Sequence, residues 1–100
     1  MKVILKFTYD SHLVDIPDKL ANNEKQLKAI VRKFDKWLYD KSNDHGLWVI
    51  RDNRKTAVCF GGNDFIDWIN SRLLKDDDKK AVILDEDFDG DDTAYVKLYF

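Results

Sequence analysis

The chain has little of what disulfide-bonded and membrane proteins need. Its 100 residues include one cysteine, which excludes an intramolecular disulfide and predicts a reducing, cytoplasmic location. No apolar run is long enough for a membrane-spanning helix, and the opening MKVILKFTYD turns polar too early for a secretory signal peptide. We therefore expect no membrane partner.

Glutamate is also scarce, since the acidic residues are 17 Asp and 2 Glu. Aspartate favours helix caps and turns over helix interiors. Phe, Tyr, Met, Ile, Asn and Lys together number 37, whereas Gly, Ala, Arg and Pro number 14. AT-rich codons encode the first group, so the composition predicts a bacterial, phage or mobile-element genome rich in AT.

The residues that are abundant indicate a globular protein. The chain is 44% hydrophobic and 36% charged, which predicts one folded domain over residues 1–100. The net charge of −2 hides a strong asymmetry. Residues 1–75 carry a net charge of +4 and residues 76–100 a net charge of −6, so the chain is an electrical dipole along its length.

Hydrophobic periodicity predicts seven secondary-structure elements. β-Branched and aromatic residues predict strands over 2–9, 47–51, 56–60, 81–84 and 93–100. Apolar residues at three- and four-residue spacing predict helices over about 22–41 and 65–75. The order β-α-β-β-α-β-β favours an α+β fold, a two-layer sandwich in which two helices cover one face of a mostly antiparallel five-stranded sheet.

The stretch DEDFDGDD, residues 85–92, places six acidic side chains in eight positions. Asp89-Gly90 between two predicted strands indicates a hairpin with a type I′ turn. This register places Asp87 opposite Asp92, and like charges that face each other across strands are destabilising. Because folding gains nothing from such a pair, the sequence predicts that the acidic hairpin binds a partner.

An acidic surface can imitate nucleic-acid phosphates and occupy a basic groove. We therefore expect a non-enzymatic protein-binding module or inhibitor, monomeric or homodimeric, whose acidic hairpin docks on the basic, nucleic-acid-binding surface of a partner protein. Lone domains without motifs are common on phages and mobile elements, which favours an anti-defence protein such as an anti-CRISPR-like DNA mimic. The predicted partner-binding residues are Asp76, Asp77, Asp78, Asp85, Glu86, Asp87, Phe88, Asp91, Asp92, Tyr95 and Tyr99.

Direct nucleic-acid binding is a first alternative. Lys25, Lys28, Arg32 and Lys36 fall on the face of the first predicted helix that is opposite its apolar stripe. A row of cations on one helix face is typical of phosphate contacts. No helix-turn-helix or other nucleic-acid-binding motif accompanies it.

Calcium binding is a second alternative. Asp85, Asp87 and Asp89, followed by Gly90, match the first half of a calcium loop of the EF-hand type. Val96 stands where that loop needs a bidentate glutamate, and the flanks are predicted strands instead of helices.

The residues that nucleophilic catalysis would need are few. Cys59 precedes a predicted helix start, and His12 and His45 are the only candidate bases. Cys59 shares a strand face with Ala57, which predicts a small buried core residue. Two His and one Cys are too few for a typical structural zinc site. The sequence therefore predicts no enzyme activity, no catalytic residue, no cofactor and no metal.

Overall fold

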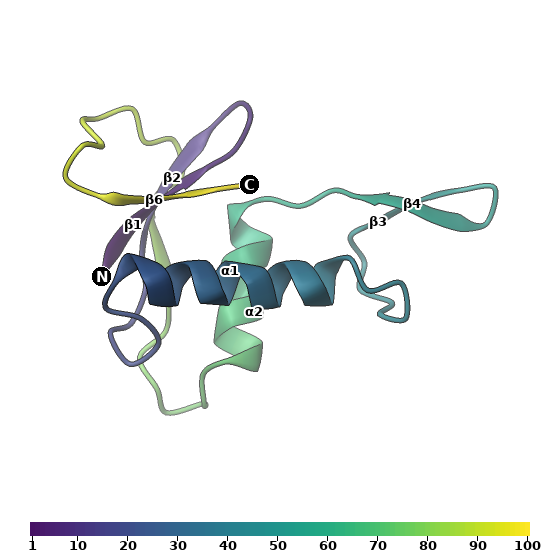
Figure 1. The fold of residues 1–100 in the computed structure, drawn as a ribbon, viewed down its shortest axis with the longest axis horizontal. Coiled ribbons are helices and arrows are strands. Elements are labelled where there is room, and N and C mark those ends of the chain that lie inside the picture. Colours follow the sequence, from purple (N-terminus) through teal and green to yellow (C-terminus); the bar gives the residue numbers. More distant parts are fainter.

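A computed structural model describes residues 1–100 and contains six strands and two helices (Figure 1). The strands form a four-stranded sheet in the order β5-β2-β1-β6 and a separate two-stranded sheet, β3-β4. The elements are β1 (Lys2–Lys6), β2 (Ser11–Asp15), α1 (Glu24–Leu38), β3 (Trp48–Arg51), β4 (Arg54–Val58), α2 (Gly62–Arg72), β5 (Val82–Asp85) and β6 (Val96–Tyr99).

The α+β class is confirmed, but the predicted five-stranded, mostly antiparallel sheet is wrong. The main sheet is mixed, because β1 pairs antiparallel with β2 and parallel with β6. Val3, Ile4 and Leu5 are all fully buried, so β1 has apolar contacts on both faces and lies inside the sheet. Strand β2 was not predicted, and β3 and β4 form a sheet of their own.

One face of the main sheet packs against both helices. The two helices supply five fully or almost fully buried side chains, namely Leu27, Phe34 and Leu38 from α1 and Phe65 and Ile69 from α2. The sheet supplies Val3, Leu5, Val14 and Leu98. Burying each large apolar side chain contributes about 1.5–3 kcal/mol, so this core fixes the helices relative to the strands.

Local hydrogen bonds set the starts of the two helices. Asn23 caps α1, since its side-chain oxygen accepts from Gln26 N at 2.9 Å. Helix α2 begins after Gly61, whose N–H donates to Asp64 Oδ2 at 2.9 Å. The cap of α2 is therefore Gly61, and Asp64 acts from the first turn of the helix.

The β3-β4 hairpin projects away from the rest of the molecule (Figure 1). Asp52 and Asn53 form its turn with φ values of 52° and 62°, the left-handed conformation that a type I′ turn requires. Because the hairpin projects, side chains on it stay accessible, and Ile50 is 62% exposed. Cys59, which follows β4, is exposed, so its predicted burial beside Ala57 is wrong.

Candidate functional site

The acidic residues 85–92 belong to a connection between two parallel strands. β5 runs antiparallel to β2, β2 runs antiparallel to β1, and β6 runs parallel to β1. β5 and β6 therefore point the same way, and the chain between them must return along the sheet. It returns on the side away from α1 and α2 (Figure 1). We call residues 85–95 the acidic connection.

The predicted hairpin of residues 81–100 is wrong. Ile83 pairs with Val14 of β2, and Val96 pairs with Val3 of β1, so the two strands have no ladder in common. A short Asp-Gly turn joins only strands that are antiparallel neighbours. Here β2 and β1 lie between them.

The predicted repulsion between Asp87 and Asp92 disappears with that register. No ladder places the two side chains opposite each other. Gly90 has no positive φ, so it does not occupy a type I′ turn. Repulsion between Asp87 and Asp92 therefore gives no reason to expect a partner.

The buried side chain of Ile4 shows that the acidic connection covers the sheet. Val3 and Leu5 pack in the core toward the helices, so Ile4 between them points to the opposite face. Ile4 is nevertheless 0% exposed. No helix lies on that side, and Phe88 N of the acidic connection donates to Ser11 O at 2.9 Å (Figure 1). The acidic connection is thus the layer over this face.

Two lysines of the sheet hold Asp92. Lys6 Nζ lies 2.7 Å from Asp92 Oδ2, and Lys97 Nζ lies 3.8 Å from Asp92 Oδ1. The hydrogen bond from Lys6 lowers the pKa of Asp92 below its usual 3.8, and the charges of both lysines act in the same direction. Asp92 is therefore an anchor of the acidic connection.

Aromatic packing adds a second anchor. The rings of Phe88 and Tyr95 meet edge to face with centroids 6.0 Å apart, and both side chains are half-buried. Gly90 lies against the Phe88 ring, because a Cβ atom at Gly90 would lie 3.0 Å from that ring. Tyr95 and Tyr99 also line one cavity of about 390 Å³, together with Lys97.

The other carboxylates of the acidic connection face solvent and have no ion pair. Two of them shape the backbone: Asp85 Oδ1 accepts from Asp87 N at 3.0 Å, and Asp91 Oδ1 accepts from Thr93 N at 3.0 Å and Thr93 Oγ1 at 2.8 Å. The bonds from Thr93 lower the pKa of Asp91. The unpaired, exposed set is Asp85, Glu86, Asp87, Asp89 and Asp91.

Asp76, Asp77 and Asp78 lie at the other end of β5, before its first residue, and the acidic connection follows its last residue. Figure 1 places the two loops at opposite ends of the main sheet. Asp78 pairs with Lys19 at 2.7 Å, and this hydrogen bond lowers the pKa of Asp78. The two acidic clusters therefore do not form one surface.

The calcium alternative receives no support from the geometry. No group of three or more His, Cys, Asp or Glu side chains is arranged to hold a metal ion. Asp85, Asp87 and Asp89 lie on the surface of the acidic connection, and the carboxylate of Asp85 turns back onto its own backbone.

The predicted basic face of α1 is present. Lys25, Lys28, Arg32 and Lys36 are all exposed. Lys28 pairs with Glu24 at 3.3 Å, and the other three have no ion pair. An exposed pair of this kind contributes only about 0.3–0.5 kcal/mol, so Lys28 remains able to exchange partners.

The β3-β4 hairpin holds two further free cations, which none of the predicted sites included. Arg51 and Arg54 stand directly opposite each other across the β3-β4 hairpin, exposed and without an ion pair. The predicted strands 47–51 and 56–60 leave the four residues 52–55 between them, so Arg54 has no predicted partner across the strands. Asp52-Asn53 as a two-residue type I′ turn was the signal that places the two arginines face to face.

The structure assembles no nucleophile with a base. His12 is almost buried, with Nε2 3.2 Å from Asp10 Oδ2, and its buried Nδ1 has no partner. His45 Nε2 lies 2.8 Å from Leu38 O. No hydrogen bond joins either histidine to Cys59.

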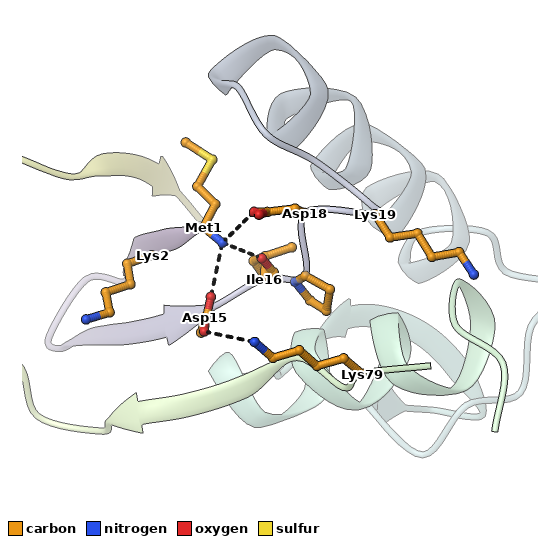
Figure 2. A pocket seen from close by; sticks show the side chains of 8 residues that line it. Met1, Lys2, Asp15, Ile16, Asp18, Lys19 and Lys79 are labelled. Atoms are coloured by element: carbon orange, nitrogen blue, oxygen red, sulfur yellow. Dashed lines mark hydrogen bonds and ion pairs between the residues drawn. The ribbon is translucent and has the colours of Figure 1, made fainter. Parts of the chain in front are cut away.

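The largest cavity, of about 500 Å³, lies beside the first residues of β1 and the end of β2 (Figure 2). The Met1 ammonium contacts both of its carboxylates, Asp15 and Asp18, at 3.1 Å, and donates to Ile16 O. Lys79 approaches Asp15 at 4.0 Å from the other side. Each carboxylate here has a cationic partner, so the cavity offers no free acid–base pair.

The features that remain as candidates for a function are the acidic connection and the free cations of α1 and of the β3-β4 hairpin. Neither helix has the length and apolar character needed to cross a membrane. No known protein family, curated protein or solved structure matches this chain.

Proposed function

We propose that this chain is a non-enzymatic binding protein, whose acidic connection docks on a basic surface of a partner protein. One observation carries the proposal. A loop with five unpaired, exposed carboxylates is fastened to the sheet by Asp92, which pairs with Lys6 and Lys97. The anchor and the presented charges are different residues.

A loop that is already ordered loses less conformational entropy when it binds. The bond from Phe88 N to Ser11 O and the Phe88–Tyr95 contact restrict the acidic connection before a partner arrives. The hydrogen bonds that Asp85 and Asp91 accept from the backbone N–H groups of Asp87 and Thr93 act in the same way. The carboxylates thus repel one another at fixed positions, and a cationic surface relieves that repulsion.

In its narrower form, the proposal is an inhibitor that imitates nucleic-acid phosphates. A run of carboxylates at fixed positions complements the field of a nucleic-acid-binding groove. Phe88 and Tyr95 supply half-buried aromatic surface within the same loop, the type of side chain that is enriched at interface anchors. An anti-defence role of the anti-CRISPR type belongs to this narrower form.

The test uses two charge-reversal variants that change the net charge by the same amount. Glu86→Lys with Asp87→Lys alters the acidic connection but leaves its anchor Asp92 intact. Asp76→Lys with Asp77→Lys makes the same charge change at the opposite end of β5, also at exposed residues without an ion pair. Tagged wild type and both variants are used to capture proteins from nuclease-treated lysate, and duplex DNA is then added.

We expect wild type and the Asp76, Asp77 variant to retain a protein that the Glu86, Asp87 variant does not. Added DNA should release it, because both ligands compete for one basic surface. Equal recovery by all three proteins, or a capture that DNA leaves unchanged, contradicts the proposal.

Nucleic-acid binding is the second candidate function, favoured by the unpaired Arg51 and Arg54 at the hairpin tip and by the row of cations on α1. It predicts that the affinity for duplex DNA falls steeply with salt concentration. Arg51→Glu with Arg54→Glu should reduce both the affinity and the salt dependence. A salt-independent interaction, or none, contradicts this candidate.

A further inference from the structure

A groove of about 270 Å³ lies between helix α1 and the edge strand β6. None of the exposed carboxylates of the acidic connection lines it. The core fixes both walls, because Leu98 is buried in it and Val31 packs against it. The groove is therefore preformed. Its lining consists of Lys28, Val31 and Arg32 from α1 and Lys97, Leu98 and Tyr99 from β6.

The outer edge of β6 borders this groove. β6 is the last strand of the main sheet and pairs with β1 along one side only. Its register sets Ile4 opposite Lys97 and Lys6 opposite Tyr99, and Phe100 N donates to Lys6 O at 2.9 Å.

This register decides which backbone groups are free. In a parallel ladder, a residue of one strand bonds the two residues that flank its partner on the other strand. The N–H and C=O groups of Val96 and Leu98 therefore face β1. Those of Lys97 and Tyr99 point outward, beyond the sheet, where no backbone hydrogen bond engages them.

The charge of the groove is of one sign. Its lining holds three cations and no carboxylate. Arg32 has no ion pair, Lys28 has only the exposed pair with Glu24 at 3.3 Å, and Lys97 lies 3.8 Å from an Asp92 that Lys6 holds more closely. Weak pairs of this kind exchange readily for an incoming carboxylate.

We propose that this groove binds an extended acidic segment of a partner protein, which adds to β6 as a fifth strand of the main sheet. The backbone of the segment pairs with the outward groups of Lys97 and Tyr99, and its carboxylates meet Arg32 and the neighbouring lysines. Tyr99, which is 72% exposed, covers the added strand from the side. This second surface contains none of the five exposed carboxylates of the acidic connection, and it shares only Lys97 with the anchor at Asp92.

Two other occupants fit the groove less well. A second copy of this chain that paired through β6 would bring two Lys97 side chains and two sets of groove cations together, which is unfavourable. A nucleic acid would satisfy the cations but cannot form a strand ladder with the free N–H and C=O groups of Lys97 and Tyr99.

The probe is a labelled synthetic peptide of about eight residues, in which glutamate and valine alternate. Alternation places all its carboxylates on one face, and a one-residue slip in register decides whether that face points toward α1 or away from it. A matched peptide carries N-methyl groups on every second residue, which blocks strand pairing and keeps the charge.

Hydrogen exchange of the β6 amides gives the sharpest readout. The amides of Lys97 and Tyr99 should exchange quickly in the free protein and slow by at least about tenfold with the alternating peptide. The amide of Leu98 already pairs with β1 and should change little. No protection at Lys97 and Tyr99, or equal binding of the alternating peptide and its N-methylated match, overturns the proposal.

Charge-reversal variants test the walls of the groove. Lys28→Glu with Arg32→Glu should weaken peptide binding at least about tenfold. Lys25→Glu with Lys36→Glu makes the same charge change on α1 but outside the groove lining. This variant should bind the peptide with an affinity within about threefold of that of wild type. An equal loss in both variants, or displacement of the peptide by single-stranded DNA with no amide protection, shows a general basic surface instead.

Discussion

The ammonium group of Lys6 lies 2.7 Å from a carboxylate oxygen of Asp92, and this contact fastens the acidic connection to the central strand β1. Both side chains are only about one-third exposed, at 30% and 28%. The residue that anchors the loop is thus inside the acidic cluster, and the residues that present charge surround it. The surface proposed for binding is ordered by the fold itself.

The first prediction concerns this anchor. Asp92→Asn should lower the free energy of unfolding at neutral pH, because Lys6 and Lys97 then face each other without a carboxylate between them. Urea denaturation of wild type, Asp92→Asn, Lys6→Met and the double variant measures the coupling. Strictly additive losses from the two single variants would show that the pair does not couple the loop to β1.

The second prediction is the pH dependence of that anchor. The pKa of Asp92 is below 3.8 in the folded chain, so its stabilisation is present above the unfolded pKa and is lost as the pH falls through the folded pKa. The stability difference between wild type and Asp92→Asn should therefore be large at neutral pH and vanish in strong acid. A difference that stays constant across this range contradicts the assignment.

The third prediction tests whether the acidic connection covers the sheet. Ile4→Ala should destabilise the protein by about 2–5 kcal/mol, the cost of a cavity in a closed core. Val82→Ala on the edge strand β5 is the control, because Val82 is 44% exposed and its truncation should cost less than about 1 kcal/mol. Equal small losses for both variants in urea denaturation would mean that Ile4 is open to solvent.

The fourth prediction concerns Arg51 and Arg54, which face each other in the hairpin. Arg51→Glu should stabilise the β3-β4 pairing by about 0.2–1 kcal/mol, because an attractive pair replaces a repulsive one. Amide hydrogen exchange of the hairpin measures this effect. Adding Arg54→Glu restores two like charges and should cancel the gain; a gain that persists in the double variant rules out charge pairing as its cause.

The helices and most strands could be predicted from local patterns, whereas the pairing of the strands could not. The apolar stripe of α1 runs through Leu27, Phe34 and Leu38, and all three are buried. No strand is predicted over Ser11–Asp15, which forms β2 in the structure. Its partner β1 is what makes it a strand.

The candidate site, too, could be predicted in its local features but not in its contacts between distant residues. The charge of residues 85–92 is visible in the sequence, and so is the local Asp-Gly signal that suggested a hairpin. The burial of Ile4 on the second face of β1 requires a cover, and the parallel direction of β5 and β6 supplies it by sending the acidic connection across that face. Both facts depend on contacts between residues far apart in the chain.

The central claim is that the acidic connection is the docking surface, and the most direct test is the affinity of the captured, DNA-released partner for three proteins at one salt concentration. Compared with wild type, Glu86→Lys with Asp87→Lys should bind at least about a hundredfold more weakly, and Asp76→Lys with Asp77→Lys should stay within about threefold. Equal weakening by both variants would mean that only net charge matters, and no weakening by the first would mean that the partner binds elsewhere.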